Sequence, residues 1–198
     1  ILFIAGMMLM VEGMERAGFF RWLCLTIAKA VHYKTIPIFI SFMLMSAFLA
    51  MFIDSITVIL FLAAVTVELA HLLHFDPIPM IISEIFCSNL GGSATMCGDP
   101  PNIIIGTSLG YSFKDFILNT GVATVFVIIV GLICMYFIYG RKLFVTDESI
   151  AKVMQLDENK AIKDRKLMHE SVIVIILVAL CFIFHDQLGV QSCTVAIA

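Results

Sequence analysis

The stretch Ser88-Asn89-Leu90-Gly91-Gly92-Ser93-Ala94-Thr95-Met96-Cys97-Gly98-Asp99-Pro100-Pro101-Asn102 decides the fold, because it places helix-breaking and polar residues between two apolar runs. Its three glycines weaken a helix, and its two prolines lack the backbone N–H that a helix interior requires. Within and just after the glycine-rich part, Ser93, Thr95, Asp99 and Asn102 offer oxygen ligands within a few residues. Within a membrane, such a break is tolerated only where it faces protein or a water-filled cavity, and in secondary transporters it forms substrate and ion sites. The stretch therefore predicts a broken helix that contributes to a site of this kind.

The composition indicates a polytopic membrane protein with an all-α fold. The 198 residues are 61% hydrophobic and 14% charged, whereas a soluble domain is about half apolar and about a quarter charged. A formal net charge of −3 gives no basic surface for nucleic acid, and this class of partner is excluded. The six cysteines are scattered without CxxC or CxH spacing, which argues against a disulfide framework or a metal site. No Ser-His-Asp order or phosphate-binding loop is present, so we do not expect an enzyme.

The first part of the chain predicts two helices before the main membrane segments. Residues 1–14 begin with an uncharged run too short to span a bilayer, and we expect them to be the end of a transmembrane helix. Residues 15–33 mix charged with aromatic side chains, which suits a helix in the membrane interface. A solvated amphipathic connector is an alternative for this segment. The chain starts at Ile1 without a basic leader and stops at Ala198 after an apolar run; we expect both ends to be cuts through a longer protein.

Residues 35–74 contain two uncharged runs, 35–53 and 55–67, that meet at Asp54-Ser55-Ile56-Thr57, and the second is followed by Glu68, His71 and His74. One continuous helix would be about 60 Å long, twice the hydrocarbon thickness. The segment therefore either crosses twice, with Asp54 in an outer loop, or enters and returns as a re-entrant hairpin with Asp54 near the midplane. The second arm has few uncharged residues for a full crossing, which favours the re-entrant hairpin.

Residues 77–113 are too long for one straight span and fit two half-helices around an unwound centre at 91–102. Residues 116–140 are uncharged throughout and predict an unbroken transmembrane helix. The polar linker 141–170 holds seven of the twelve Lys and Arg residues, so the positive-inside rule predicts that it is cytoplasmic. Residues 171–198 would then begin a second repeat. The protein is expected to be an integral, multi-pass membrane protein.

Two carboxyl groups within the apolar segments are the main candidates for function. Asp54 and Asp99 are costly inside a bilayer, by roughly 3 kcal/mol on insertion scales, and such groups usually mark ion pathways. The alternative for Asp54 is a helix cap at an exposed turn, and for Asp99 a turn residue before proline. Glu84 is a further membrane acid that suits either proton transfer or packing. Cys97 suits a small core residue better than a ligand for a thiophilic solute.

The ligand chemistry of these groups favours a hard cation. Carboxylate, hydroxyl and carbonyl oxygens suit Na⁺ or a proton and do not suit a soft metal. The membrane core has no Lys or Arg, so an anion would depend on the N-termini of the half-helices or on a bound cation. We expect no resident cofactor, only Na⁺ or H⁺ as a coupling ion.

The stretch from Asn89 to Asn102 resembles the signature of the ion transporter superfamily, also described as having a citrate transporter-like domain. It is most similar to the branch of arsenical pump membrane proteins, NhaD-type Na⁺/H⁺ antiporters and the melanosomal P protein. Asp54-Ser55-Ile56-Thr57 resembles the hairpin-tip motif of that branch, usually Asp-Asn-Val-Thr-Thr. Here Ser55 replaces the Asn and Val58 replaces the second Thr, so ligation at the tip is expected to differ.

The resemblance implies one inverted-repeat unit with an interfacial helix, a re-entrant hairpin, a broken transmembrane helix and a returning helix. It also implies a cation site built from the hairpin tip and the unwound helix. Carried over to this sequence, that site comprises Asp54, Ser55, Thr57, Ser88, Asn89, Gly92, Thr95, Gly98, Asp99 and Asn102. The second repeat, which would complete the site, is expected in a missing C-terminal half of the same protein.

The predicted function is ion-coupled secondary transport by alternating access, with Na⁺/H⁺ antiport first. Arsenite export and citrate or dicarboxylate transport are the alternatives within the superfamily. A membrane scaffold without transport, whose polar breaks only cap and pack helices, is the alternative from another class. The expected partners are a small ion or solute, membrane lipid and the missing half of the chain; a homodimer stays open.

Overall fold

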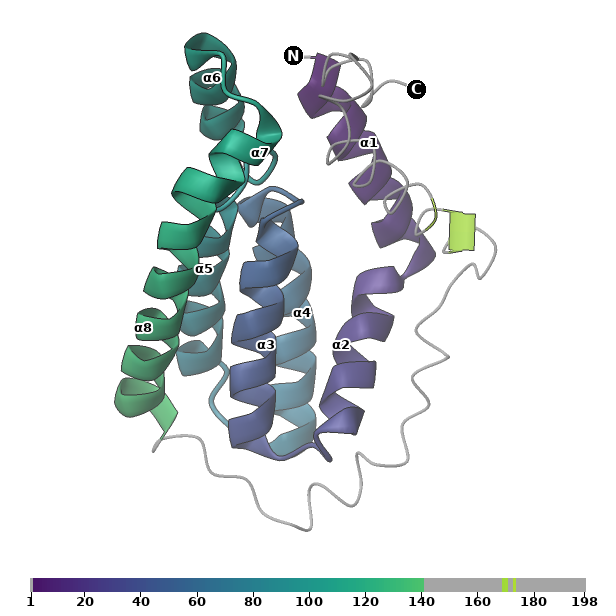
Figure 1. Cartoon of the computed structure of the whole chain (residues 1–198). Helices are drawn as coiled ribbons and strands as arrows, with labels where there is room; N and C mark the ends of the chain where they lie inside the picture. The colour runs from purple at the N-terminus through teal and green to yellow at the C-terminus, as the bar shows by residue number, and fades with distance from the viewer. Residues whose placement is uncertain (1, 141–168, 171–172, 174–198) are drawn as a thin grey trace.

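The protein is described here by a computed structural model, which covers residues 2–140, 169–170 and 173. Over residues 2–140 it is built from helices joined by short turns (Figure 1). The bounds are α1 Leu2–Ala17, α2 Phe19–Ala30, α3 Thr35–Ala50, α4 Ser55–Leu73, α5 Ile78–Gly92, α6 Pro100–Leu109, α7 Phe113–Phe116, the π-helical η1 Ile117–Gly121 and α8 Val122–Tyr139. The predicted all-α class is confirmed. The predicted linker 141–170 and repeat start 171–198 lie, apart from residues 169, 170 and 173, outside the described residues.

α1 and α2 meet at Gly18, which adopts the left-handed conformation with φ 83°. Glycine reaches this conformation without steric cost, so the chain can turn between two helices with a single residue. The predicted boundary between residues 14 and 15 falls about one turn too early, because the charged residues Glu12, Glu15 and Arg16 continue α1. Arg16 and Glu12 form an i,i+4 ion pair that supports this last turn.

α3 and α4 form a helical hairpin with a tip at residues 51–54. Asp54 ends the tip and caps α4, since its carboxylate accepts a hydrogen bond from the Thr57 backbone N–H at 2.9 Å. α3 makes its most extensive contact with α5. At that contact Gly91 lies so close to the Ala47 carbonyl that a Cβ could not be accommodated, which fixes the spacing between the hairpin and α5.

The broken helix consists of α5, a turn at residues 93–99, and α6. The break is narrower than the predicted 91–102, because α5 extends through Gly92 and α6 begins at Pro100. Pro100 and Pro101 occupy the first turn of α6, where the missing N–H groups have no helical partner in any case. These prolines therefore start a helix rather than interrupt one.

α7, η1 and α8 form one long helical segment beside α5. It begins at Phe113, before the predicted residue 116, because Ser112 and Asp115 form a reciprocal capping box. The π-helical turn η1 places Gly121 against the break: a Cβ there would lie 3.0 Å from the Ala94 carbonyl oxygen. The Ser93 and Thr124 hydroxyls, 3.2 Å apart, also join the break to α8.

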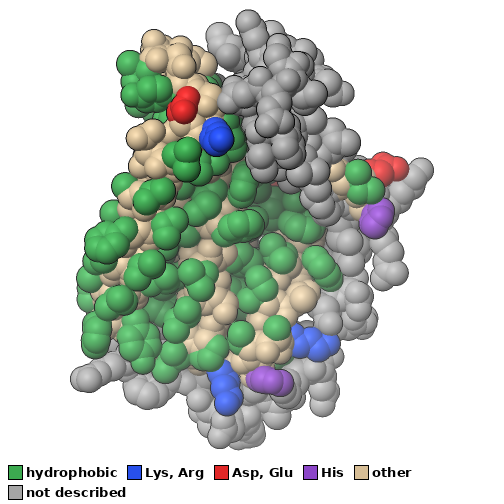
Figure 2. Space-filling view, in the orientation of Figure 1, with side chains coloured by type: hydrophobic (Ala, Val, Ile, Leu, Met, Phe, Trp, Pro, Cys, Tyr) green, Lys and Arg blue, Asp and Glu red, His purple; other side chains and the backbone are tan. Residues whose placement is uncertain are grey.

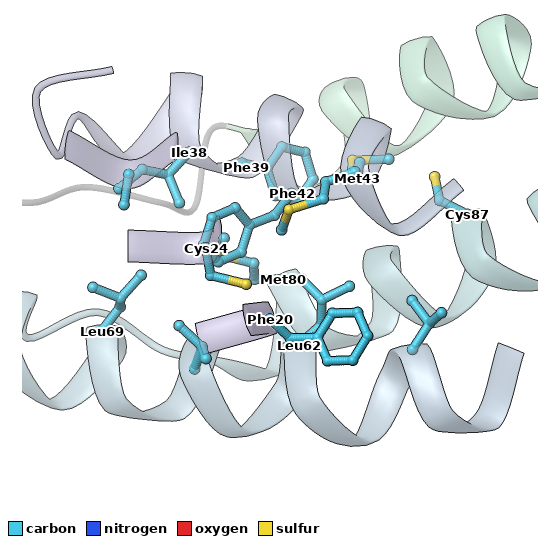
Figure 3. Packing of buried hydrophobic residues seen from close by; sticks show 14 of the residues in the cluster. Phe20, Cys24, Ile38, Phe39, Phe42, Met43, Leu62, Leu69, Met80 and Cys87 are labelled. Atoms are coloured by element: carbon cyan, nitrogen blue, oxygen red, sulfur yellow. The ribbon is translucent and has the colours of Figure 1, made fainter. Parts of the chain in front are cut away.

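Large apolar side chains from α2, α3, α4 and α5 point into one core (Figure 3). Phe39 and Phe42 of α3 are fully buried there. The rings of Phe20 and Phe61 stack with centroids 3.8 Å apart and join α2 to α4. This core holds the hairpin between α2 and the broken helix.

The surface over α3, α5 and α8 is apolar along most of its height, and charged side chains show only toward the two ends (Figure 2). On α8 most large side chains are exposed, for example Phe126 at 69% and Phe137 at 70%. Within the described residues, Ser55–Leu73 and Phe113–Tyr139 are long and apolar enough to cross a membrane. Apolar side chains on the outside are stable in lipid and costly in water. The chain is an all-α membrane protein.

Candidate ion site at the hairpin tip and the broken helix

The hairpin tip and the break meet through Ser55 and Asp99, which are 44 residues apart in sequence. The Ser55 hydroxyl donates to Asp99 Oδ1 at 2.6 Å, and the Ser55 backbone N–H lies 3.3 Å from the same oxygen. Ser55 is buried and Asp99 is half-buried. The predicted contact between the two motifs is therefore present in the structure.

Helix ends supply favourable electrostatics for the two carboxylates. Asp54 stands at the N-terminus of α4, and Asp99 stands at the N-terminus of α6 in extended conformation. Backbone N–H groups at a helix N-terminus carry partial positive charge, which favours a carboxylate there. Only Oδ1 of Asp99 accepts a hydrogen bond within the described residues, while Oδ2 lies against the backbone of Gly92.

Gly92 and Gly98 allow the backbone to approach this carboxylate closely. A Cβ on Gly92 would lie 2.7 Å from Ser55 Oγ and 2.8 Å from Asp99 Cγ. A Cβ on Gly98 would lie 2.6 Å from the Ala50 carbonyl oxygen. Both positions require glycine for space. The crowding atoms belong to Ser55 and Asp99 at Gly92, and to Ala50 and Gly92 at Gly98.

Thr95 and Asn102 hold the turn in place. The Thr95 hydroxyl donates to the Met51 carbonyl of the hairpin tip and accepts from the Cys97 backbone N–H at 3.2 Å. The Asn102 amide donates to the carbonyls of Gly92 at 2.7 Å and Thr95 at 2.9 Å. Asn102 thus joins the start of α6 to the end of α5 across the break.

Ser88 supports the tip from α5, since its hydroxyl donates to the Ser55 carbonyl at 3.2 Å. Asp54 lies at the tip, and the hydrogen bond it makes is the cap on α4 that the alternative interpretation predicted, although Asp54 is half-buried and not at an exposed turn. Thr57 lines a cavity of about 440 Å³ between α4 and the α1–α2 junction. Residues two apart on a helix point to nearly opposite sides, so Ser55 faces Asp99 and Thr57 faces this cavity.

Asn89 is exposed and donates to the Ile85 carbonyl of its own helix at 2.9 Å. It follows Ser88 directly, and the helical rotation carries it off the face that meets the hairpin. The structure therefore gathers seven of the ten predicted residues around one point: Ser55, Ser88, Gly92, Thr95, Gly98, Asp99 and Asn102. Asp54 borders them, while Thr57 and Asn89 face elsewhere.

The sequence did not single out the backbone carbonyls that line the same place, because every residue carries one. The carbonyls of Ala50, Met51 and Gly92 all approach the break. The Met51 and Gly92 carbonyls already accept hydrogen bonds from Thr95 and Asn102, and all of these atoms, like those of the Asp99 carboxylate, are oxygens of the type that hard cations prefer. Among the described residues, no group of three or more His, Cys, Asp or Glu could hold a metal ion.

Comparison with known proteins places the chain in a family. A family model described as "Citrate transporter" matches residues 1–198. An uncharacterized transporter of Mycobacterium bovis is 34% identical over 197 residues, which are 100% of this chain and 46% of the relative. A 46 kDa membrane protein of Mycobacterium leprae is 32% identical over 188 residues, 95% of this chain and 44% of the relative.

The P protein of Homo sapiens is 30% identical over 145 residues, 70% of this chain and 17% of that protein. The chain spans about half the length of the mycobacterial relatives it matches. The resemblance to the ion transporter superfamily is confirmed by the family match and by the P protein. The chain belongs to the citrate transporter family.

Proposed function

We propose that the full-length protein is a secondary active transporter that couples a small solute or ion to a cation by alternating access, with Na⁺/H⁺ antiport as the leading activity. The observation that carries this proposal is the contact between Ser55 of the hairpin tip and Asp99 of the break. Two interrupted helical elements that present polar groups to each other are the usual framework of transporter ion sites. This chain would supply one half of the site, and the remainder of the protein the other.

The donor set supports Na⁺ as the ion held here. Asp99 Oδ2, Ser55 Oγ and the nearby backbone carbonyls are oxygen ligands of the type that hard cations prefer. A cation bound beside Asp99 would also compensate the negative charge of this half-buried carboxylate, which is costly to place inside a bilayer. Ser88, Thr95 and Asn102 would position these ligands through the hydrogen bonds described above.

The short first arm supports a re-entrant hairpin, although α4, with 19 residues, is itself long enough to cross a membrane. α3, with 16 residues, is about 24 Å long, whereas the segment Phe113–Tyr139, with 27 residues, is about 40 Å long. In Figure 1 α6 and α7 extend beyond the hairpin tip. The tip would then end inside the bilayer, with the hairpin base and the linker 141–170 on the cytoplasmic side.

Citrate transport is the second candidate, and the family match favours it. Between residues 35 and 140 the one Lys or Arg is Lys114, on α7. A citrate anion at the break would therefore depend on the N-termini of α4 and α6, on a co-bound cation, or on groups outside this chain. A cation site at Asp99 is compatible with both candidates, because a bound Na⁺ could attract the anion.

The test is transport by the full-length protein in sealed vesicles. An inward Na⁺ gradient should move protons outward, as followed by a trapped pH-sensitive dye, and labelled citrate uptake should be measured under the same gradient. Asp99→Asn should abolish the transported activity, and Asp54→Asn should reduce it. Asp76→Asn is the matched control: Asp76 is an exposed carboxylate that caps Ile78 at 3.1 Å, and its removal should leave transport unchanged.

Wild-type rates in both Asp99→Asn and Asp54→Asn would show that the site is misassigned. Absence of any movement of Na⁺, protons or citrate by the wild type would favour a membrane scaffold. Citrate uptake without Na⁺-driven proton movement would replace antiport by the second candidate.

A further inference from the structure

Glu84 is a buried acid that the candidate ion site does not use. It lies on α5, is 1% exposed, and faces the hairpin. The Thr66 hydroxyl of α4 donates to Glu84 Oε1 at 2.6 Å. Oε2 is buried and has no hydrogen-bond partner within the described residues. A side chain with one satisfied and one unsatisfied oxygen at the centre of an apolar bundle requires an explanation.

The groups around Glu84 do not compensate a negative charge. Ser46 donates to the Glu84 backbone carbonyl at 2.7 Å, and Ser83 donates to the Pro79 carbonyl at 2.8 Å, so neither hydroxyl serves the carboxyl group. Glu84 forms no ion pair in the described part of the chain.

The helices packed against α5 are α3, α4 and α8, and α3 carries no titratable side chain. The titratable groups on the other two helices, on α5 itself and close to Glu84 on α2 are thiols, phenols, one acid and one imidazole: Cys24 on α2, Glu68 and His71 on α4, Cys87 on α5, and Cys134, Tyr136 and Tyr139 on α8. Glu68 pairs with Arg21, and His71 is exposed near the end of α4. None of them supplies a cation to the Glu84 carboxyl group.

We propose that Glu84 is the proton-binding residue of this half of the transporter, separate from the ion site at Asp99. An unpaired carboxylate in apolar surroundings costs several kcal/mol, and the neutral acid avoids this cost. The proton resides on Oε2, while Oε1 accepts the hydrogen bond from Thr66. Release breaks the Oε2–H bond and passes the proton to water that reaches Oε2 when α4 and α5 separate. The carboxylate left behind then requires hydration, which keeps the two helices apart.

The same helix pair connects this proton to the ion site. On α5, Glu84, Ser88 and Gly92 follow one another at i, i+4 and i+8, and therefore share one face. On α4, Ser55 and Thr66 are eleven residues apart and also share a face, because eleven residues complete three turns. Thr66 contacts Glu84 at one end of the interface, and Ser55 contacts Ser88 and Asp99 at the other. Proton binding thus stabilises the packing that brings Ser55 to Asp99.

The test uses Glu84→Gln in the full-length protein and two readouts. The first is the infrared carbonyl band of a protonated carboxylic acid, recorded in H₂O and D₂O. The wild type and Asp99→Asn should show this band, and Glu84→Gln should lack it. Thr66→Val, which keeps the shape of the side chain and removes the hydrogen bond to Oε1, should retain the band at a higher frequency. This variant preserves the test if Glu84→Gln does not fold.

The second readout is transport in vesicles, and it rests on the function proposed above. Glu84→Gln should retain exchange of labelled Na⁺ for Na⁺, and its Na⁺-driven proton movement should be lost, because glutamine cannot bind and release a proton at this position. Asp99→Asn should lose both activities. If the wild type transports no Na⁺, the proposed antiport fails, while the infrared band still decides whether Glu84 holds a proton. Identical bands, or wild-type proton movement, in Glu84→Gln would overturn the proposal.

Discussion

Replacing Gly92 with alanine tests the contact between the hairpin tip and the break without removing any polar group. The added Cβ would lie 2.7 Å from Ser55 Oγ and 2.8 Å from Asp99 Cγ, well inside ordinary van der Waals contact. The crowding atoms belong to two short, hydrogen-bonded side chains, neither of which can swing away freely. The methyl group must therefore push Ser55 and Asp99 apart and lengthen their 2.6 Å hydrogen bond.

The expected cost follows from the bond that is lost. A hydrogen bond to a charged group contributes about 1.5–3 kcal/mol. If the coupling ion requires Ser55 and Asp99 together, its affinity should fall by about 10- to 150-fold. Overpacking of the surrounding core should in addition lower the free energy of unfolding by about 1–3 kcal/mol.

The assay is the dependence of transport by the full-length protein on Na⁺ concentration, with Gly106→Ala as the matched control. Gly106 lies on α6, and a Cβ there would lie 2.9 Å from the sulfur of Met96, a flexible side chain that can move. Gly106→Ala should keep the wild-type half-saturation constant, and Gly92→Ala should raise it. Equal constants for Gly92→Ala and the wild type would refute the close packing inferred at the site.

Three further predictions concern the scaffold around the site. Asn102→Ala removes both hydrogen bonds that bridge the break and should lower the free energy of unfolding of the full-length protein by about 1–3 kcal/mol; an unchanged denaturation midpoint would contradict this role. Arg21→Ala breaks the 2.5 Å ion pair with Glu68, and because both side chains are partly exposed, stability should change by less than about 1 kcal/mol. A cysteine at Ser55, in a background without other reactive cysteines, should be protected from an impermeant reagent outside the vesicle, whereas a cysteine at Ser112 should be labelled. Labelling at both positions would place the hairpin tip in an outer loop.

The sequence predicted the main elements because their signals are local. Helix-breaking glycines and polar residues marked the break, and Asp54 marked the tip between two uncharged runs. The predicted break is wider than the observed one because Pro100 and Pro101, which lack the N–H of a helix interior, fit the first turn of α6. The turn between α1 and α2 lies at Gly18, about one turn later than predicted, because a single glycine in a mixed segment gives little signal.

The sequence predicted which residues lie close to the hairpin tip and the break better than the directions in which their side chains point. The motif resemblance identified Thr57 and Asn89, but helical rotation turns both away from Asp99. Backbone carbonyl ligands cannot be selected from a sequence, since all residues possess them. The contact between Thr66 and Glu84 could not be predicted either, because α4 and α5 are apolar on most sides and their facing registers depend on packing.

Binding of Na⁺ to the purified full-length protein tests the central claim most directly. Thermal unfolding should be measured in NaCl and in choline chloride at equal ionic strength, because a ligand that binds the native state raises the unfolding temperature. Na⁺ should stabilise the wild type and Asp76→Asn, and it should have no such effect on Asp99→Asn. An equal Na⁺-dependent stabilisation of Asp99→Asn would contradict the assignment of an ion site to the hairpin tip and the broken helix.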